Sequence, residues 1–146
     1  LSTDGNVLAI LFEVADEEQG KKIQESMKKF RMNKGFSTAT NYPKYALKHI
    51  FPPFIPLFMA DYHNGQDWLW IGCCDAVSKH MVGLKEEAVE LLSNMAKKMD
   101  EYDGVFEVYF KGKPLKRPFY SSARNFAWSS GLYIWACETI GIKKNN

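Results

Sequence analysis

The chain has 146 residues, 46% of them apolar and 14% aromatic, which suits one packed core and excludes a disordered chain. Its 19 basic and 17 acidic residues leave a net charge of only +2, which argues against a nucleic-acid partner because such binders usually carry a strong positive field. Three cysteines, two of them adjacent, and three scattered histidines form neither a disulfide framework nor a zinc motif. We therefore expect one unit over residues 1–146, without cofactor, metal or membrane segment, in a reducing cytoplasm.

The first part of the chain predicts two helices. Residues 7–12 are apolar at every position, and the sequence that follows them favours a buried helix over a strand. Asp16 and Gln19 have the spacing of a capping box, in which the Asp16 side chain accepts a hydrogen bond from the Gln19 amide at the start of a second helix. Apolar residues at i, i+4 and i+7 from Ile23 place one stripe on that helix, which is typical of a helix that covers a core from outside.

Residues 31–67 show no period and are interrupted by prolines, which predicts a long irregular connection rich in aromatic side chains. Connections of this length are uncommon in compact domains and are often functional. Within the connection, Asn64-Gly65 predicts a tight turn with positive φ. Residues 68–81 are mostly apolar and predict a buried helix, with Asp67 interpreted as its N-cap.

The last part predicts an amphipathic surface helix followed by an apolar one. Residues 84–102 gather their apolar side chains on one stripe. Residues 105–110 are an apolar run with one carboxylate, Glu107, in its middle. Either an edge strand points Glu107 to water, or the carboxylate is partly buried and has a functional role. Residues 123–140 predict a final helix that is apolar almost all round.

The alternation of apolar and amphipathic helices has a geometric consequence. It predicts αα-hairpins packed side by side, with the apolar helices inside and the amphipathic helices outside. All inner helices then run in the same direction, so the segments that precede them meet at one end of the domain. Helix N-termini present free amides and positive dipole ends there. We therefore expect an all-α fold with a site at that end, containing Glu107.

Six short motifs occur in the order found in one group of enzymes. They are Asp4-Gly5-Asn6 with Leu8-Ala9-Ile10, Ala15-Asp16-x-Glu18-Gln19, Tyr62-His63-Asn64-Gly65-x-x-Trp68, Ala88-Val89-Glu90-Leu91, Glu107-x-Tyr109 and Trp128-Ser129-x-Gly131. Together they resemble the C-terminal part of glycoside hydrolases with an (α/α)6 barrel, in the amylo-α-1,6-glucosidase (glycogen-debranching) and neutral invertase group. The resemblance implies an (α/α)6 toroid of six hairpins, of which this chain supplies about half.

The resemblance also implies an activity and site residues. Glu107 matches the general base of an inverting hydrolysis of an α-linked glucoside or oligosaccharide. The implied sugar-pocket residues are Tyr62, Asn64 and Trp68, with Asp4 and Asn6 at the same end. An inverting enzyme also needs a general acid about 6.5–9.5 Å from the base, and no second carboxylate occurs here in a matching motif. The chain is thus expected to be the C-terminal portion of a larger catalytic domain, and to associate with the missing N-terminal half or with itself through exposed half-barrel faces.

For several residues the sequence is compatible with two roles. Trp68 is compatible with stacking on a sugar ring and with a core position, and His63 with polarising a sugar hydroxyl and with capping the turn. The basic residues of the 111–117 loop suit either an anionic group or a solvated loop. The competing function is a non-catalytic helical module that binds carbohydrate or a partner. Which glycoside is bound or cleaved does not follow from the sequence.

Overall fold

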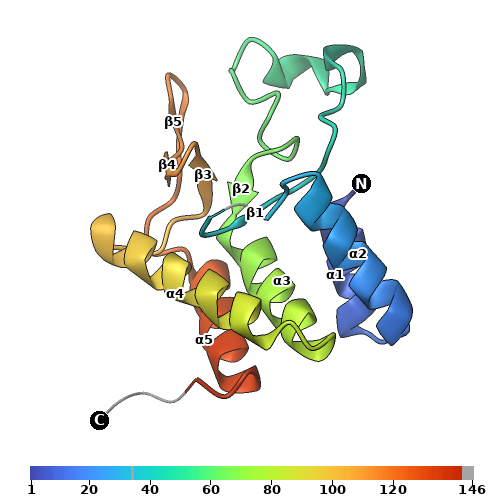
Figure 1. Ribbon diagram of the computed structural model, residues 1–146. Helices are drawn as coiled ribbons and strands as arrows, with labels where there is room; N and C mark the ends of the chain where they lie inside the picture. Colours follow the sequence, from blue (N-terminus) through green and yellow to red (C-terminus); the bar gives the residue numbers. More distant parts are fainter. Residues whose placement is uncertain (34, 143–146) are drawn as a thin grey trace.

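The computed structural model describes residues 1–33 and 35–142, and its α-helices lie together on one side of two small sheets (Figure 1). In chain order the elements are α1 (Thr3–Leu11), α2 (Glu17–Lys29), β1 (Thr38–Ala39), 3-10 helices at Leu47–His49 and Pro52–Phe54, β2 (Asp67–Trp68), α3 (Leu69–Met81), α4 (Lys85–Glu101), β3 (Val108–Phe110), β4 (Lys113–Pro114), β5 (Lys116–Arg117), β6 (Tyr120–Ser121) and α5 (Ala127–Thr139). None of the helices in the described ranges has the length and apolar composition needed to cross a membrane.

The expectation of an all-α fold, half of an (α/α)6 toroid, is wrong. The described residues are 50% helical and 12% strand, with β1, β2, β3 and β4 in one antiparallel sheet and β5 paired with β6 in another. Trp68 of β2 lies opposite Thr38 on one side and Val108 on the other. β-branched and aromatic residues suit such a pleated surface, and the pairing satisfies backbone groups that the long connections would otherwise bury unpaired. The fold is therefore mixed α/β.

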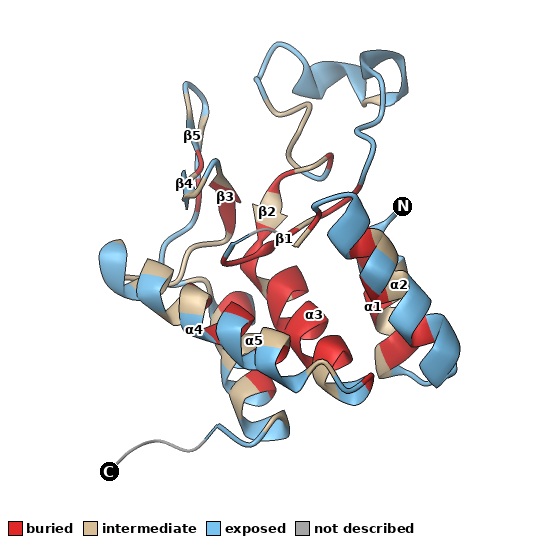
Figure 2. Ribbon diagram, viewed as in Figure 1, coloured by how far each residue is buried: buried red, intermediate tan, exposed pale blue. Residues whose placement is uncertain are grey.

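Helix α3 lies at the centre of the helical layer and is buried over most of its length (Figure 2). It packs against α1, α4 and α5 and against the strands β1 and β2. The largest core cluster is formed by Phe36, Leu69, Cys73, Ala76, Val77, Leu91, Leu92, Met95, Tyr109 and Ala136. The amphipathic helices α2 and α4 cover α1 and α3 and leave their polar sides exposed, in agreement with the apolar stripes of their sequences.

Of three local predictions at helix ends and turns, two are confirmed and one is wrong. The capping box is confirmed, because the Gln19 amide donates to the Asp16 carboxylate at 2.8 Å and the Asp16 amide donates to the Gln19 side chain at 2.9 Å. Gly65 has a φ of 96°, as the turn requires. The predicted Asp67 cap is wrong. Trp68 occupies the N-cap of α3 without a side-chain cap bond, and Asp67 belongs to β2, where it pairs with both neighbouring strands.

The N-terminal ends of α1, α3 and α5 all lie beside the sheets (Figure 1). The Thr3 amide at the start of α1 donates to the Thr40 carbonyl at 2.9 Å. Helix α3 continues directly from β2. The Phe126 amide, just before α5, donates to the Val105 carbonyl at 2.9 Å. The connections that precede these helices are therefore neighbours in space.

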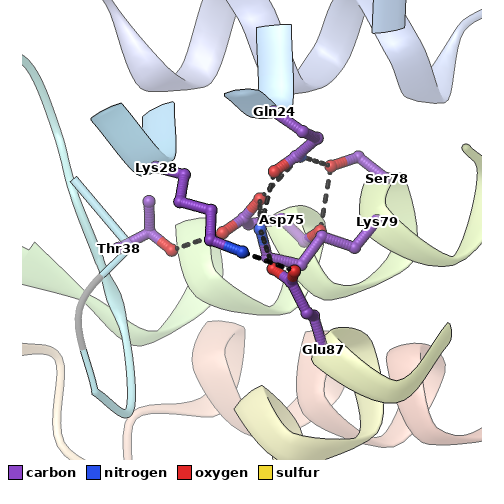
Figure 3. A network of polar contacts seen from close by, with 7 residues as sticks. All are labelled: Gln24, Lys28, Thr38, Asp75, Ser78, Lys79 and Glu87. Atoms are coloured by element: carbon purple, nitrogen blue, oxygen red, sulfur yellow. Dashed lines mark hydrogen bonds and ion pairs between the residues drawn. The ribbon is translucent and has the colours of Figure 1, made fainter. Parts of the chain in front are cut away.

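A buried polar network ties β1, α2 and α4 to α3 (Figure 3). Asp75 is fully buried and accepts hydrogen bonds from Gln24 at 2.8 Å and Thr38 at 3.0 Å. Lys79 is 4% exposed and donates to Gln24 at 2.6 Å. Its ammonium lies 3.6 Å from Asp75 and 4.0 Å from Glu87. Buried charges are tolerated only with such partners, so these contacts hold three elements in one arrangement around α3.

Candidate functional site

Glu107 lies just before β3 and is held by two tyrosine hydroxyls. The Tyr62 hydroxyl donates to Oε1 at 2.5 Å, and the Tyr120 hydroxyl donates to Oε2. The two hydroxyl oxygens are 3.4 Å apart. The Glu107 amide donates to the Ala123 carbonyl at 3.0 Å, so the main chain is fixed as well. A carboxylate with one donor on each oxygen is oriented and keeps acceptor capacity on both oxygens.

The two tyrosines come from different connections. Tyr62 precedes the Asn64-Gly65 turn, and its carbonyl accepts a hydrogen bond from the Trp68 indole at 2.9 Å. Tyr120 lies in β6. Burial, assisted by the hydrogen bond to Glu107, raises the pKa of Tyr62 to about 12, and the same causes raise the pKa of Tyr120. Both hydroxyls therefore stay protonated at neutral pH and act as donors toward the carboxylate.

Three rings form an aromatic wall next to this carboxylate. The His63 ring stacks on Trp68 with centroids 4.5 Å apart and an interplanar angle of 12°. Tyr62 meets both rings edge-on, at 4.7 Å from His63 and 4.8 Å from Trp68. Trp68 is only 4% exposed, whereas His63 is an exposed residue. The ring accessible to a ligand is therefore that of His63, with Trp68 as its support.

The charges of two carboxylates, those of Glu107 and Asp4, act on His63. His63 is exposed, but the Tyr62 and Trp68 rings packed against it remove part of its hydration and lower its pKa below the usual 6.5. The negative charges of Glu107 and Asp4 oppose this effect on the pKa. The imidazole is therefore neutral at pH 7 and can both donate and accept a hydrogen bond. Asp4 is exposed in the first turn of α1, and its carboxylate accepts from the Gly5 amide at 2.9 Å. Asn6 donates its side-chain hydrogen bond to a local carbonyl of the same turn, at 2.6 Å.

Asn64 lies behind the site. It is buried, and its side-chain carbonyl accepts from Asn41 at 3.0 Å and from the Tyr45 amide at 2.6 Å. Its amide group donates to the carbonyls of Tyr45 at 3.0 Å and Ala60 at 3.3 Å. These bonds hold the long connection in the shape that carries Tyr62. A direct sugar contact by Asn64 stays a prediction.

A salt bridge joins the two connections on the side of the basic loop. The Arg117 guanidinium of β5 donates to the Asp61 carboxylate at 3.1 Å, and the Gln66 side chain also donates to Asp61. The hairpin that carries Tyr120 is thereby tied to the turn that carries Tyr62. Arg117 therefore has a structural partner within the chain. The sequence alone left open whether the basic residues of this loop bind an anionic group or are solvated.

The structure brings together Glu107, Tyr62 and Trp68, which the sequence motifs indicate, and adds His63 and Tyr120 to the cluster. The sequence leaves His63 with two interpretations. Tyr120 lies in a stretch without periodicity, so no repeating pattern points to it. The turn residue Pro118, between the paired Arg117 and Tyr120, is the only sequence signal of the hairpin that returns this tyrosine to Glu107.

Comparison with known proteins leaves the site as the main guide to function. No protein-family model matches the chain, and no curated protein matches it. In the part of the chain that the structure describes, no three His, Cys, Asp or Glu side chains gather as a metal centre. The glycoside hydrolase assignment therefore stays a hypothesis that rests on the sequence motifs and on the surroundings of Glu107.

One carboxyl next to the aromatic wall is expected to weaken the fold at neutral pH. Burial raises the pKa of Asp67 from 3.8 to about 6, with Lys44 acting in the opposite direction. A carboxyl whose pKa is raised by folding favours the folded state at low pH, and this advantage is lost as the pH rises from about 4 to 6. Asp67→Asn is therefore expected to raise the free energy of unfolding at pH 7 by up to about 3 kcal/mol, at about 1.4 kcal/mol per pKa unit.

Urea denaturation of both proteins at a series of pH values measures this effect. The difference between Asp67→Asn and the parent chain should shrink through about pH 4 and disappear near about pH 3, where the carboxyl is neutral in both states. Asp100→Asn, at an exposed position of α4, serves as the matched control. A gain of equal size at pH 3 and pH 7 would contradict the proposed cause.

Proposed function

We propose that this chain supplies Glu107 as the general base of an inverting glycoside hydrolase acting on an α-linked glucoside or oligosaccharide. The observation that supports this proposal best is the pair of tyrosine hydroxyls that orients both oxygens of the carboxylate. An oriented carboxylate with free lone pairs can hold a water molecule and take its proton. The motifs that resemble glycogen-debranching enzymes point to the same residue.

In this mechanism the water oxygen attacks the anomeric carbon of the sugar while Glu107 accepts the proton of the water. The bond between the anomeric carbon and the leaving oxygen breaks, and its electron pair goes to that oxygen, which takes a proton from a general acid. The acid comes from another segment or subunit. The aromatic wall offers the apolar C–H face of the sugar a surface, with His63 nearest to the ligand.

The proposed setting is the cytoplasm. The three cysteines, Cys73, Cys74 and Cys137, are all free thiols, and free thiols persist in reducing compartments. Burial also raises the pKa values of the Cys73 and Cys74 thiols, which keeps them protonated and inert.

A substrate that needs no general acid tests the proposal on this chain alone. Fluoride leaves an α-glucosyl fluoride without being protonated, so a site with only the base should still hydrolyse it. The expected first product is β-glucose. In Glu107→Ala the reaction should almost stop, and added azide should restore it by attacking the anomeric carbon and displacing fluoride, which yields β-glucosyl azide. NMR identifies both products.

Glu138→Ala, at an exposed position near the end of α5, is the control and should behave like the parent chain. Release of α-glucose, or an unchanged rate in Glu107→Ala, would rule out the assignment.

The second candidate is a non-catalytic module that binds carbohydrate. The His63–Trp68 stack favours it as much as it favours an enzyme, because such a platform serves binding with or without chemistry. Calorimetric titration with a maltooligosaccharide should detect binding in both cases, and His63→Ala should weaken it in both. Binding without any fluoride release from the parent chain would favour this candidate over the hydrolase.

A further inference from the structure

Helix α5 is apolar on almost all sides but is covered on one side only. It packs against α3, and Ser129 and Ala136 are its only fully buried residues. Trp128 is 59% exposed and Ile134 is 58% exposed. A helix that is apolar all round is normally enclosed by protein. The open side of α5 therefore has the composition of an interface.

An apolar groove of about 630 Å³ runs along this open side. Helices α1 and α5 form its walls and α3 its floor. The floor residues are Trp70, Cys74, Val77 and Met81, at i, i+4, i+7 and i+11, and the wall residues of α5 have the same spacing from Trp128 onward. This is the stripe that one helix presents to another in packed helical layers. Among the described residues that line the groove there is no Asp, Glu, Lys, Arg or His.

Gly131 beside the wall stripe is a second, independent sign. Glycine inside a helix costs stability relative to alanine, and it is often used where another backbone approaches closely. Apart from its chain neighbours and the backbone of its own helix, no atom of the described residues lies within 4 Å of the position that a Cβ of residue 131 would occupy. The packing of the described chain therefore does not require a glycine here, whereas the close approach of another molecule would.

We propose that this apolar face is a protein–protein interface, and that in a solution of this chain its occupant is the same face of a second copy. A face without charges meets itself without repulsion, and two-fold contacts of this self-complementary kind are the commonest in oligomers. Large aromatic side chains bury about 150–250 Å² each. Phe12, Trp128 and Trp135 are 73%, 59% and 38% exposed, so only part of this area is available on each. Together with neighbours such as Ile134 and Met81, the face offers on the order of 500 Å² per partner, the size of a weak, concentration-dependent interface. The proposal is independent of the proposed hydrolase activity.

Sedimentation velocity of the full chain over a concentration series tests the proposal. The parent chain should form a dimer. Gly131→Leu should shift it toward monomer and raise the dissociation constant at least tenfold, because the new side chain fills the space into which the partner packs. Leucine is the better helix former and meets open space in the monomer, so the thermal stability of the monomer should not fall.

Two further variants complete the design. Trp135→Glu should also give monomers, because it places a charge in the uncharged groove. Val89→Glu, at a 43% exposed position of α4 away from the groove, should leave the dimer unchanged. A monomeric parent chain at all concentrations would overturn the proposal, and so would a dimer that survives both Gly131→Leu and Trp135→Glu.

Discussion

Glu107→Gln is expected to lower the rate of α-glucosyl fluoride hydrolysis by about 10²–10⁴-fold, the range that a general base contributes. Glutamine keeps the size and shape of the side chain but cannot take a proton from water. Its carbonyl can still accept from one of the hydroxyls of Tyr62 and Tyr120, so the site should keep its shape. Initial rates of fluoride release measure the effect.

The affinity for an oligosaccharide should change little in Glu107→Gln, which separates a chemical role from a binding role. Tyr62→Phe is a useful companion, because it removes one of the two donors that orient the carboxylate and leaves Glu107 in place. It should give a smaller loss of rate than Glu107→Gln. A Glu107→Gln protein with the turnover of the parent chain would exclude Glu107 as the base.

Asp75→Ala is expected to lower the free energy of unfolding by about 3–5 kcal/mol, the cost of leaving a buried charge without its partner. Among the described residues, Lys79 would keep only Glu87, at 4.0 Å, as an acidic neighbour. The donors of Gln24 and Thr38 would lose their acceptor in a site closed to water. Urea unfolding followed by circular dichroism measures the change.

Two controls distinguish the lost ion pair from the lost volume. The double variant Asp75→Leu with Lys79→Met removes both charges and should recover much of the stability, since apolar replacement of a whole buried pair is often neutral. Asp100→Ala, exposed on α4, should change stability by no more than about 0.5 kcal/mol. An unfolding midpoint of Asp75→Ala equal to that of the parent chain would show that the network does not hold α2 and β1 to α3.

The helices were predictable because their signals are local. A helix repeats its contacts every three or four residues, so the capping box at Asp16 and the stripe of residues 84–102 are visible in the sequence alone. Glu107 was also identifiable, because a single carboxylate in an apolar run must have either solvent or a partner. The partners themselves were not all identifiable. Tyr120 lies 13 residues away, and a two-strand hairpin returns it to the carboxylate.

The prediction of the fold class was wrong for the same physical reason. Strands as short as Thr38–Ala39 and Asp67–Trp68 carry no period of their own, and their pairing is decided by which connections the packed helices bring together. The resemblance to a helical barrel implied helices throughout the chain, so it did not predict the sheets. The prediction for helix α5 was wrong in a different way. Its apolar composition predicted an enclosed helix, whereas the described chain leaves one side of it open.

The sequence by itself determined the helices, the turn at Gly65 and the presence of one exceptional carboxylate, because each depends on neighbours within a few residues. Tertiary structure alone decided the sheets, the two tyrosines on Glu107, the burial of Trp68 beneath His63 and the open apolar face. Each of these depends on contacts between segments far apart in the chain, and such contacts form only when the helices around α3 have packed.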